Sequence, residues 1–238
     1  MKNYFEKISI YLDGANIEEI SSFAKNNIVK GFTTNPTLMK NAGIKDYLEF
    51  TKEACKKSNN KPISFEVFTD DFESMEKEAE KISSIAENVY VKIPITNTKG
   101  EFSGDLIKVL SDKGIKLNIT AIFTTEQCNN LSKFLNPATE TIISLFCGRI
   151  ADTGRNPEDI CRESKKIFST SDKFRILWAS TREIYNIAQA IDYNCDIITV
   201  PGNILSKLTN FDKDLELFSL ETVKMFYEDA KKAGYKIL

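Results

Sequence analysis

Short apolar runs recur along the chain, separated by longer stretches of mixed character. Each run has five to seven residues, many of them β-branched or aromatic, which is typical of strands buried on both faces. One run follows another at intervals of roughly 30 residues, with turn residues between them. The predicted strands span residues 8–13, 30–35, 62–68, 88–94, 116–120, 141–147, 174–179 and 195–200.

The stretches between the runs carry apolar residues at helical spacing. Pro157 is placed for the first helical position after Asn156, and Gly114 is placed to end a helix. Capping-box spacing is found at Asn16 with Glu19, Thr124 with Gln127 and Ser180 with Glu183. The predicted helices span residues 17–27, 46–57, 72–88, 101–114, 126–135, 157–168 and 182–193.

Strictly alternating strands and helices predict an α/β fold with parallel strands. Eight such units in 238 residues match a single (β/α)8 TIM barrel. The alternative is a doubly wound open sheet, but that fold usually has fewer strands, and its Gly-rich phosphate fingerprint is missing here. No linker or composition shift divides the chain, so we expect one domain over residues 1–238.

The last part of the chain is too long to be a plain eighth barrel helix. Residues 212–234 predict a C-terminal helical extension of one or two helices. We expect part of this extension to pack on a neighbouring subunit.

Composition narrows the function classes. The chain is 42% hydrophobic and 28% charged, as in soluble globular proteins, and its net charge of −2 favours neither nucleic acid nor membrane as a partner. No apolar run approaches the roughly 20 residues of a membrane span. Glu6 and Asp13 interrupt the N-terminal stretch, which therefore lacks a signal-peptide core. We expect a cytoplasmic protein.

Histidine is absent from the chain. Its absence excludes Ser–His and Cys–His nucleophile pairs and every metal site that needs imidazole. Acid–base chemistry is left to carboxylates, lysine, tyrosine, cysteine or water. Neither a metal nor a cofactor is expected. The cysteines are odd in number and never spaced C-x-x-C, which favours small core residues over disulfides or zinc: Cys55, Cys128, Cys147, Cys161 and Cys195.

The stretch VYVKIPIT, residues 89–96, places a lysine inside a predicted buried strand. Burying an ammonium group without a partner is costly, so Lys92 needs either a function or an edge position in the sheet. In a water-poor barrel mouth the charged form of lysine is disfavoured. A neutral amine attacks carbonyls and forms a Schiff base, and the iminium then accepts electrons from a breaking carbon–carbon bond.

Polar residues recur at the carboxyl ends of the predicted strands, where barrel enzymes carry their catalytic side chains. Each one alone has an ordinary explanation as a cap, turn residue or surface charge, but the recurrence at one end of most strands favours a shared site. Two carboxylates in different environments supply acid and base, amides and hydroxyls hold substrate hydroxyls and water, and arginines with a helix-starting serine bind phosphate. The residues are Asp13, Asn35, Glu66, Lys92, Asn118, Thr120, Arg149, Ser180 and Arg182.

Around these residues the sequence resembles the transaldolase family. The motifs YLDGAN, GFTTNPTLM, VKIP, NIT, FCGRI, ASTR and CDIITVPGNIL occur in the family's order and spacing. The resemblance implies that Lys92 is the Schiff-base lysine and Asp13 the acid–base for carbon–carbon cleavage. It implies that Glu66 works through a water held by Thr120. It further implies that Asn35 and Asn118 bind substrate hydroxyls and that Arg149, Ser180 and Arg182 bind phosphate.

A relative of the same fold, fructose-6-phosphate aldolase, releases free dihydroxyacetone and is the alternative. The aldolase carries Gln in place of Glu66 and Tyr in place of Phe146, and it lacks the arginine that this chain has as Arg182. At all three positions this chain is similar to transaldolase. The comparison also implies that Phe146 is a substrate-site residue. Trp178 departs from the family's pattern, because a small residue is usual there. A ring that faced the mouth would reshape the substrate site.

The resemblance implies a transferase that moves a dihydroxyacetone unit from sedoheptulose 7-phosphate or fructose 6-phosphate to an aldose phosphate. Phosphorylated sugars are therefore the expected partners. The length is similar to that of the short transaldolases, which form pentamers stacked into decamers, so a homo-oligomer is expected. The pentose phosphate pathway and surface-sugar synthesis both stay open as the pathway. A phosphosugar-binding barrel without turnover is a third, non-enzymatic alternative.

Overall fold

Eight parallel strands close into a barrel in which each strand pairs with the next and β8 pairs with β1. The computed structural model describes residues 5–237, so the outer bounds of the expected domain, 1 and 238, lie outside them. The predicted (β/α)8 barrel is confirmed. The strands are β1 (Ser9–Asp13), β2 (Val29–Thr33), β3 (Ile63–Glu66), β4 (Val89–Pro94), β5 (Leu117–Ile122), β6 (Thr141–Leu145), β7 (Phe174–Trp178) and β8 (Ile197–Pro201).

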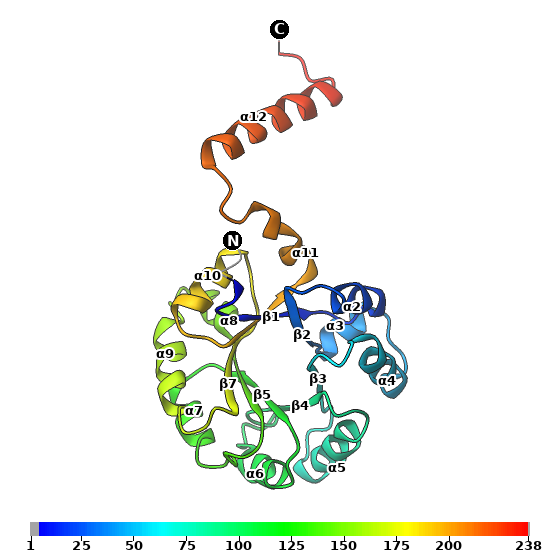
Figure 1. Ribbon diagram of the computed structural model, residues 1–238, viewed down its shortest axis with the longest axis vertical. Helices are drawn as coiled ribbons and strands as arrows, with labels where there is room; N and C mark the ends of the chain where they lie inside the picture. Colours follow the sequence, from blue (N-terminus) through cyan, green and yellow to red (C-terminus); the bar gives the residue numbers. More distant parts are fainter. Residues whose placement is uncertain (1–4, 238) are drawn as a thin grey trace.

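Helices surround the barrel, and the chain then leads out into a separate C-terminal helix (Figure 1). The seven predicted helices are present, although most are shorter than the patterns suggested; α3, α8 and α11 were not predicted. The helices are α2 (Ile17–Ala24), α3 (Pro36–Asn41), α4 (Tyr47–Lys57), α5 (Phe72–Ser83), α6 (Gly104–Asp112), α7 (Thr125–Leu131), α8 (Cys147–Ala151), α9 (Glu158–Ile167), α10 (Tyr185–Asp192), α11 (Gly202–Leu205) and α12 (Leu215–Lys232).

Along each strand, successive side chains point alternately outwards to the helices and inwards to the barrel interior. The outward residues form a large apolar cluster with the inner faces of the helices, and all five cysteines are buried as free thiols. Inside the barrel, a smaller apolar cluster includes Tyr11, Tyr90, Ile142, Leu177 and Ile197. This cluster fills the interior beneath the residues at the carboxyl ends of the strands.

The amino-terminal end of the barrel is closed by polar contacts. Arg175 Nη2 donates to Ser9 Oγ at 2.8 Å and to the carbonyl of Asp196 at 3.3 Å. The Tyr90 hydroxyl donates to the carboxylate of Glu140. Arg175 is the second residue of β7 and therefore lies at the end opposite the residues nominated for the site.

Helix starts follow the sequence signals in most places. The Thr124–Gln127 capping box is present, and Asn16 accepts a hydrogen bond from the backbone N–H of Glu19 at 2.9 Å. The capping box predicted for Ser180 is wrong. Helix α10 begins at Tyr185, and the side chain of Asn186 accepts from the backbone N–H groups that precede it. Ser180 instead adopts a left-handed conformation with φ +63°.

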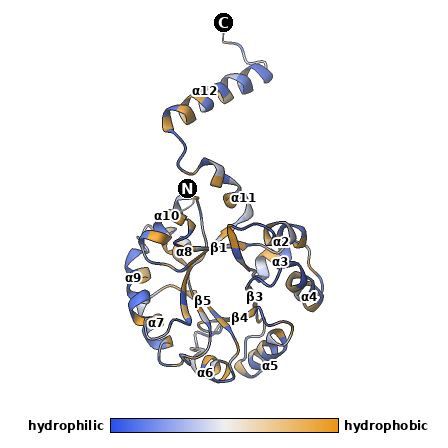
Figure 2. Ribbon diagram, viewed as in Figure 1, coloured by the Kyte–Doolittle hydropathy of each residue, from blue (hydrophilic) through white to orange (hydrophobic). Residues whose placement is uncertain are grey.

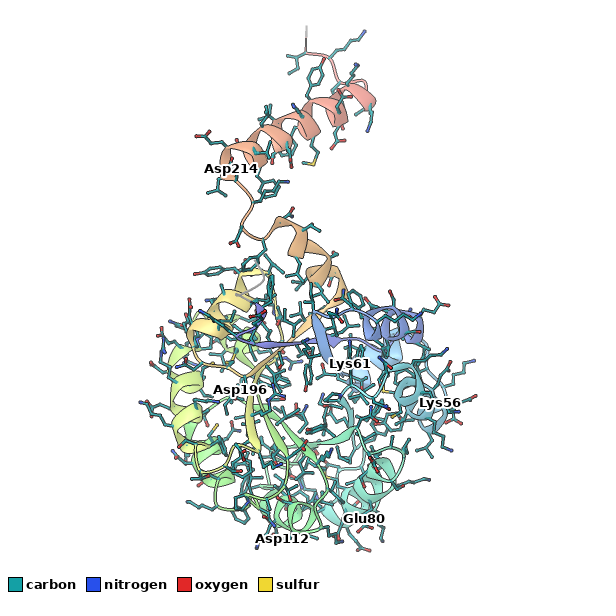
Figure 3. All side chains as sticks on the ribbon, viewed as in Figure 1. Lys56, Lys61, Glu80, Asp112, Asp196 and Asp214 are labelled. Atoms are coloured by element: carbon teal, nitrogen blue, oxygen red, sulfur yellow. The ribbon has the colours of Figure 1, made fainter. Side chains whose placement is uncertain are left out.

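The predicted C-terminal extension is the helix α12, which begins after its N-cap Asp214. A short 3-10 helix, Ser206–Asn210, leads from α11 towards it. None of the 18 residues of α12 is buried, although the apolar residues Leu215, Val223 and Phe226 lie on this helix. Apolar and polar residues alternate along it (Figure 2), and Asp214 lies well outside the barrel (Figure 3). Within residues 5–237, no helix is long and apolar enough to cross a membrane.

Candidate active site

A cavity of about 410 Å³ opens at the carboxyl ends of the strands. Every residue that the sequence nominated for the site lines this cavity, so the structure brings the whole predicted set together. Strand pairing explains why, since Glu66 pairs with Lys92 and Lys92 pairs with Asn118 in neighbouring strands. The nominated lining residues are Asp13, Asn35, Glu66, Lys92, Asn118, Thr120, Phe146, Arg149, Ser180 and Arg182.

The buried ammonium group of Lys92 has two partners. The residue is only 7% exposed, because Val91 and Ile93 face the helices and the lysine between them faces the interior. Lys92 Nζ donates to the carbonyl of Thr34 at 2.8 Å and lies 3.1 Å from Glu66 Oε2. These partners offset the cost of burying the charge and keep the amine among the other site residues.

The carbonyl of Thr34 is held in place by β3. The backbone N–H and the hydroxyl of Thr34 both donate to the carbonyl of Ser64, at 3.1 and 2.9 Å. Asn35 follows, and its side chain accepts from the N–H of Leu38 at 3.0 Å to start α3. The ordinary turn role of Asn35 and its position on the cavity therefore coexist, because capping uses only its side-chain oxygen.

Asp13 faces the cavity from the end of β1. Its Oδ1 accepts from the hydroxyl of Thr33 at 2.8 Å, and Thr33 also hydrogen-bonds to the hydroxyl of Thr199. Burial raises the pKa of the Asp13 carboxyl above its ordinary value of 3.8, while the charge of Lys92 and the hydrogen bond from Thr33 act in the opposite direction. A carboxyl whose pKa is raised is suited to exchange protons at neutral pH.

Asn118 is fixed from both sides of its amide. Its Oδ1 accepts from the hydroxyl of Ser144 at 2.6 Å, and its Nδ2 donates to Ser64 Oγ at 3.0 Å.

Sequence reasoning missed Ser144, Thr33 and Thr199, all of which line the cavity. Strand alternation carried the signal, because Ser144 lies two residues before Phe146 and Thr33 two before Asn35.

An irregularity in β5 places two consecutive residues on the cavity. The pairing of β5 with β6 shifts register between Ile119 and Ile122, and Ala121 has φ +59°. As a result Thr120 and Ala121 both line the cavity, while Ile122 returns to the apolar core. Bulges next to active sites commonly re-aim side chains in this way.

The arginines lie at one side of the cavity. Arg149 stacks over the Phe146 ring at 5.4 Å, and the Phe146 ring lies 5.5 Å from that of Phe123. Arg182 pairs with Asp152 at 2.6 Å. Helix α8, which carries Arg149, packs tightly against the end of β7.

Gly148 makes that tight packing possible. A Cβ atom at this position would lie 1.6 Å from the carbonyl oxygen of Ser180. The Gly148 N–H donates to the carbonyl of Ala179 at 3.2 Å. Only glycine therefore allows the arginine-bearing helix to contact the loop of Ser180 and Arg182.

Trp178 does not face the mouth. It is 1% exposed, belongs to the outer apolar cluster and lies 6.1 Å from the ring of Tyr193 on the helix side of β7. Its neighbours Leu177 and Ala179 line the cavity instead. The departure from the family's pattern at Trp178 is thus a change in packing between barrel and helices.

The profile of the family described as "Transaldolase/Fructose-6-phosphate aldolase" matches residues 10–237. The chain belongs to the transaldolase/fructose-6-phosphate aldolase family. A protein of Bartonella henselae named "Probable transaldolase" is 35% identical over 232 residues, covering 97% of this chain and 100% of the relative. Relatives of the same name from Methanococcus vannielii and Clostridioides difficile are each 36% identical, covering 85% and 87% of this chain and 90% and 94% of their own.

Solved structures with little sequence identity share the fold of this transaldolase/fructose-6-phosphate aldolase family member. KGPDC from Streptococcus mutans superposes with a TM-score of 0.55 at 9% identity, covering 83% of this chain and 89% of its own. Dihydrodipicolinate synthase from Rhodopseudomonas palustris gives 0.53 at 9% identity, covering 81% and 69%. At such identities the likeness concerns the barrel architecture alone.

The buried carboxyl of Asp13 should lower stability at neutral pH. Because its pKa is raised in the folded state, the free energy of unfolding falls as pH rises from 3.8 through that raised value. Asp13→Asn should therefore unfold at a higher temperature than the parent at pH 7.5, and this gain should vanish below pH 3.8. Thermal unfolding followed by circular dichroism across this pH range measures both effects.

Asp112 provides the matched control for this comparison. It is an exposed aspartate whose pKa is lowered by the hydrogen bond from Lys108, so Asp112→Asn should bring no gain at pH 7.5. An Asp13→Asn variant less stable than the parent at pH 7.5 would contradict the assignment of an unfavourable buried charge.

Proposed function

We propose that the chain is a transaldolase that transfers a dihydroxyacetone unit between phosphorylated sugars through a Schiff base on Lys92. The observation that supports this most directly is the buried Lys92 amine, which lies inside the cavity beside Glu66 and shares the cavity with Asp13. Family membership supports the reaction class, and the cavity supports the roles of single residues.

The first half-reaction forms the iminium. Lys92 gives up a proton, for which Glu66 Oε2 at 3.1 Å is the nearest carboxylate acceptor given by the structure, and the neutral nitrogen attacks the ketone of the donor sugar. The resulting carbinolamine loses water when Glu66, acting through a water held by Thr120, returns a proton to the departing hydroxyl. One N–C bond forms and one C–O bond breaks.

The second half-reaction breaks the sugar chain. Asp13 takes the proton of the hydroxyl on the scissile-bond carbon farther from the iminium. That carbon becomes the aldehyde of the leaving sugar, and the bond's electron pair moves into the iminium to give an enamine. An aldose phosphate leaves, and the enamine attacks the aldehyde of a second aldose phosphate while Asp13 returns the proton. Hydrolysis by the reverse of the first half-reaction releases the new ketose phosphate and restores Lys92.

Recognition of the substrate divides between the two sides of the cavity. Asn35 and Asn118 offer amide groups to sugar hydroxyls, while Arg149, Ser180 and Arg182 bind the phosphate, for which guanidinium groups are well suited. Sedoheptulose 7-phosphate and fructose 6-phosphate are the proposed donors. The proposal includes a cytoplasmic location and the pentose phosphate pathway, with surface-sugar synthesis as the alternative pathway.

The alternative is a lyase that releases free dihydroxyacetone, because the family description includes fructose-6-phosphate aldolase. In that reaction water, rather than an acceptor aldehyde, removes the three-carbon unit from Lys92. Glu66, Phe146 and Arg182 favour the transferase, since the lyase differs from this chain at all three positions.

We also propose that α12 packs on a second copy of this chain in a pentamer or decamer. A lone helix of 18 residues, about 27 Å long, is marginally stable in water, and α12 makes no close packing with the barrel to support it. Leu215, Leu220, Val223 and Phe226 on it are between 49% and 79% exposed. A neighbouring subunit offers these side chains the burial that their own barrel does not.

Reductive trapping tests the Schiff base. Incubation with fructose 6-phosphate and borohydride should add the sugar carbons to the peptide that contains Lys92, as read by mass spectrometry. Lys92→Ala should lose the adduct and lower kcat by about 10⁴-fold or more. Lys116→Ala, a lysine at the opposite end of the barrel, should retain both. An adduct that survives Lys92→Ala rejects the assignment, and sugar binding without any adduct supports the non-enzymatic alternative.

Substitution at two cavity positions tests the choice between transferase and lyase. A coupled assay without an acceptor sugar should detect little dihydroxyacetone release from the parent enzyme. Glu66→Gln combined with Phe146→Tyr should raise this release relative to transfer, because both changes introduce the side chains of the lyase. An unchanged ratio of the two activities counts against the roles given to Glu66 and Phe146.

Charges placed on one face of α12 test the oligomer. Leu220 and Val223 are three residues apart and share a face, so Leu220→Glu with Val223→Glu should dissociate the parent oligomer to monomers without loss of barrel structure. Size-exclusion chromatography with light scattering measures the mass. Lys232→Glu, which changes the net charge by the same amount on the opposite face of the helix, should stay oligomeric. A monomeric parent protein at micromolar concentration overturns the proposal.

A further inference from the structure

Asp152 forms an ion pair with the guanidinium group of Arg182, beside the cavity. Arg182 Nε donates to Oδ1 and Oδ2 of Asp152 at 3.1 and 3.2 Å, and Nη2 donates to Oδ2 at 2.6 Å. Asp152 is the C-cap residue of α8, whereas Arg182 follows β7. The contact thus ties together two segments that are 30 residues apart in the chain.

The ion pair with Asp152 uses one edge of the guanidinium group. A guanidinium has five N–H donors in a planar fork, and the Nε–Nη2 edge faces Asp152. Nη1 and the remaining proton of Nη2 form the second edge, which has the geometry for two parallel bonds to a phosphate. Because Arg182 lines the cavity, a substrate can reach this second edge while Asp152 retains the first.

Asp152 also influences the other arginine of the cavity. Arg149 lies three residues earlier on α8, a spacing that brings side chains together on one helix face. The hydrogen bonds from Arg182, and to a smaller extent the charge of Arg149, hold the pKa of Asp152 below its usual value. Asp152 therefore stays ionised at neutral pH, and the three side chains together carry a single net positive charge.

Stability alone is a weak explanation for this contact. Both side chains are about half exposed, at 48% and 51%, and ion pairs in such positions contribute little to stability. An unrestrained arginine, in contrast, loses considerable rotamer freedom when it binds a ligand. A restraint that exists before the ligand arrives removes part of that loss.

We propose that Asp152 is a positioning residue that holds the free edge of Arg182 ready for the phosphate of the sugar substrate. The inference rests on the phosphate-binding role proposed for Arg182, and it adds a residue that does not line the cavity and acts only through Arg182. Asp152 thereby favours phosphorylated over unphosphorylated sugars.

Binding of inorganic phosphate, measured by titration calorimetry without turnover, tests the proposal. Asp152→Ala should weaken phosphate binding about tenfold, because Arg182 is then unrestrained. Asp152→Asn retains an oxygen that accepts from Nε and should keep affinity within about threefold of the parent. Asp159→Ala, which removes a charge from an exposed position on α9, should leave phosphate affinity unchanged and so controls for net charge.

A double-substitution cycle separates positioning from a direct role. If Asp152 acts through Arg182, then Arg182→Ala combined with Asp152→Ala binds phosphate no more weakly than Arg182→Ala alone. A further loss in the double variant overturns the proposal, as does an Asp152→Ala variant that binds phosphate as tightly as the parent or more tightly. In turnover, the KM of the phosphorylated donor should rise in Asp152→Ala with a smaller change in kcat.

The readouts keep this inference distinct from the proposed reaction. Failure of borohydride trapping with normal phosphate binding rejects the transaldolase chemistry and leaves the role of Asp152 standing. Normal trapping with unaltered phosphate affinity in Asp152→Ala rejects the role of Asp152 alone. Absence of phosphate binding to the parent chain overturns both the phosphate site and its positioning residue.

Discussion

One ammonium group inside the barrel constrains the surrounding structure. Lys92 is almost fully buried, and its charge is tolerated because the carbonyl of Thr34 and the carboxylate of Glu66 reach it from the two preceding strand ends. Removal of one partner from a buried charge pair leaves the other uncompensated, which is strongly destabilising. The turn after β2 and the last residue of β3 are therefore tied to the strand that carries the lysine, and the remaining polar groups are arranged around that fixed point.

Along the barrel axis, the apolar side chains that stabilise the interior are separated from the polar side chains of the candidate site. Towards the amino ends of the strands, Tyr90, Ile142, Ile197 and other apolar side chains pack together. Towards the carboxyl ends, hydroxyl and amide groups satisfy one another around Asn118, with Ser64 and Ser144 on its two sides. Polar groups buried in this way are orienting elements as long as each has its partner. Substitutions in the loops at the carboxyl ends of the strands change the site without removing the apolar packing towards the amino ends.

The sequence predicted the barrel and the nominated cavity residues because strand ends and side-chain alternation are local properties of the chain. It failed where structure depends on tertiary contacts. Helices α3 and α8 have only six and five residues and show no helical period. Ser180 does not cap a helix, since the side chain of Asn186 already satisfies the preceding N–H groups. The pairing of Asp152 with Arg182 joins residues distant in the chain, and no spacing rule predicts it.

The pairing of β1 with β8 has a consequence for how the chain folds. Tyr11 aligns with Thr199, so the ring closes only through partners separated by nearly the full length of the barrel sequence. Such long-range pairing is slow, because the loop entropy is lost before the new contacts compensate for it. During synthesis β1 emerges first and its outer edge waits unpaired until β8 arrives. An unpaired edge is a template for association with other chains, so the interval before closure is when this protein is most prone to aggregate.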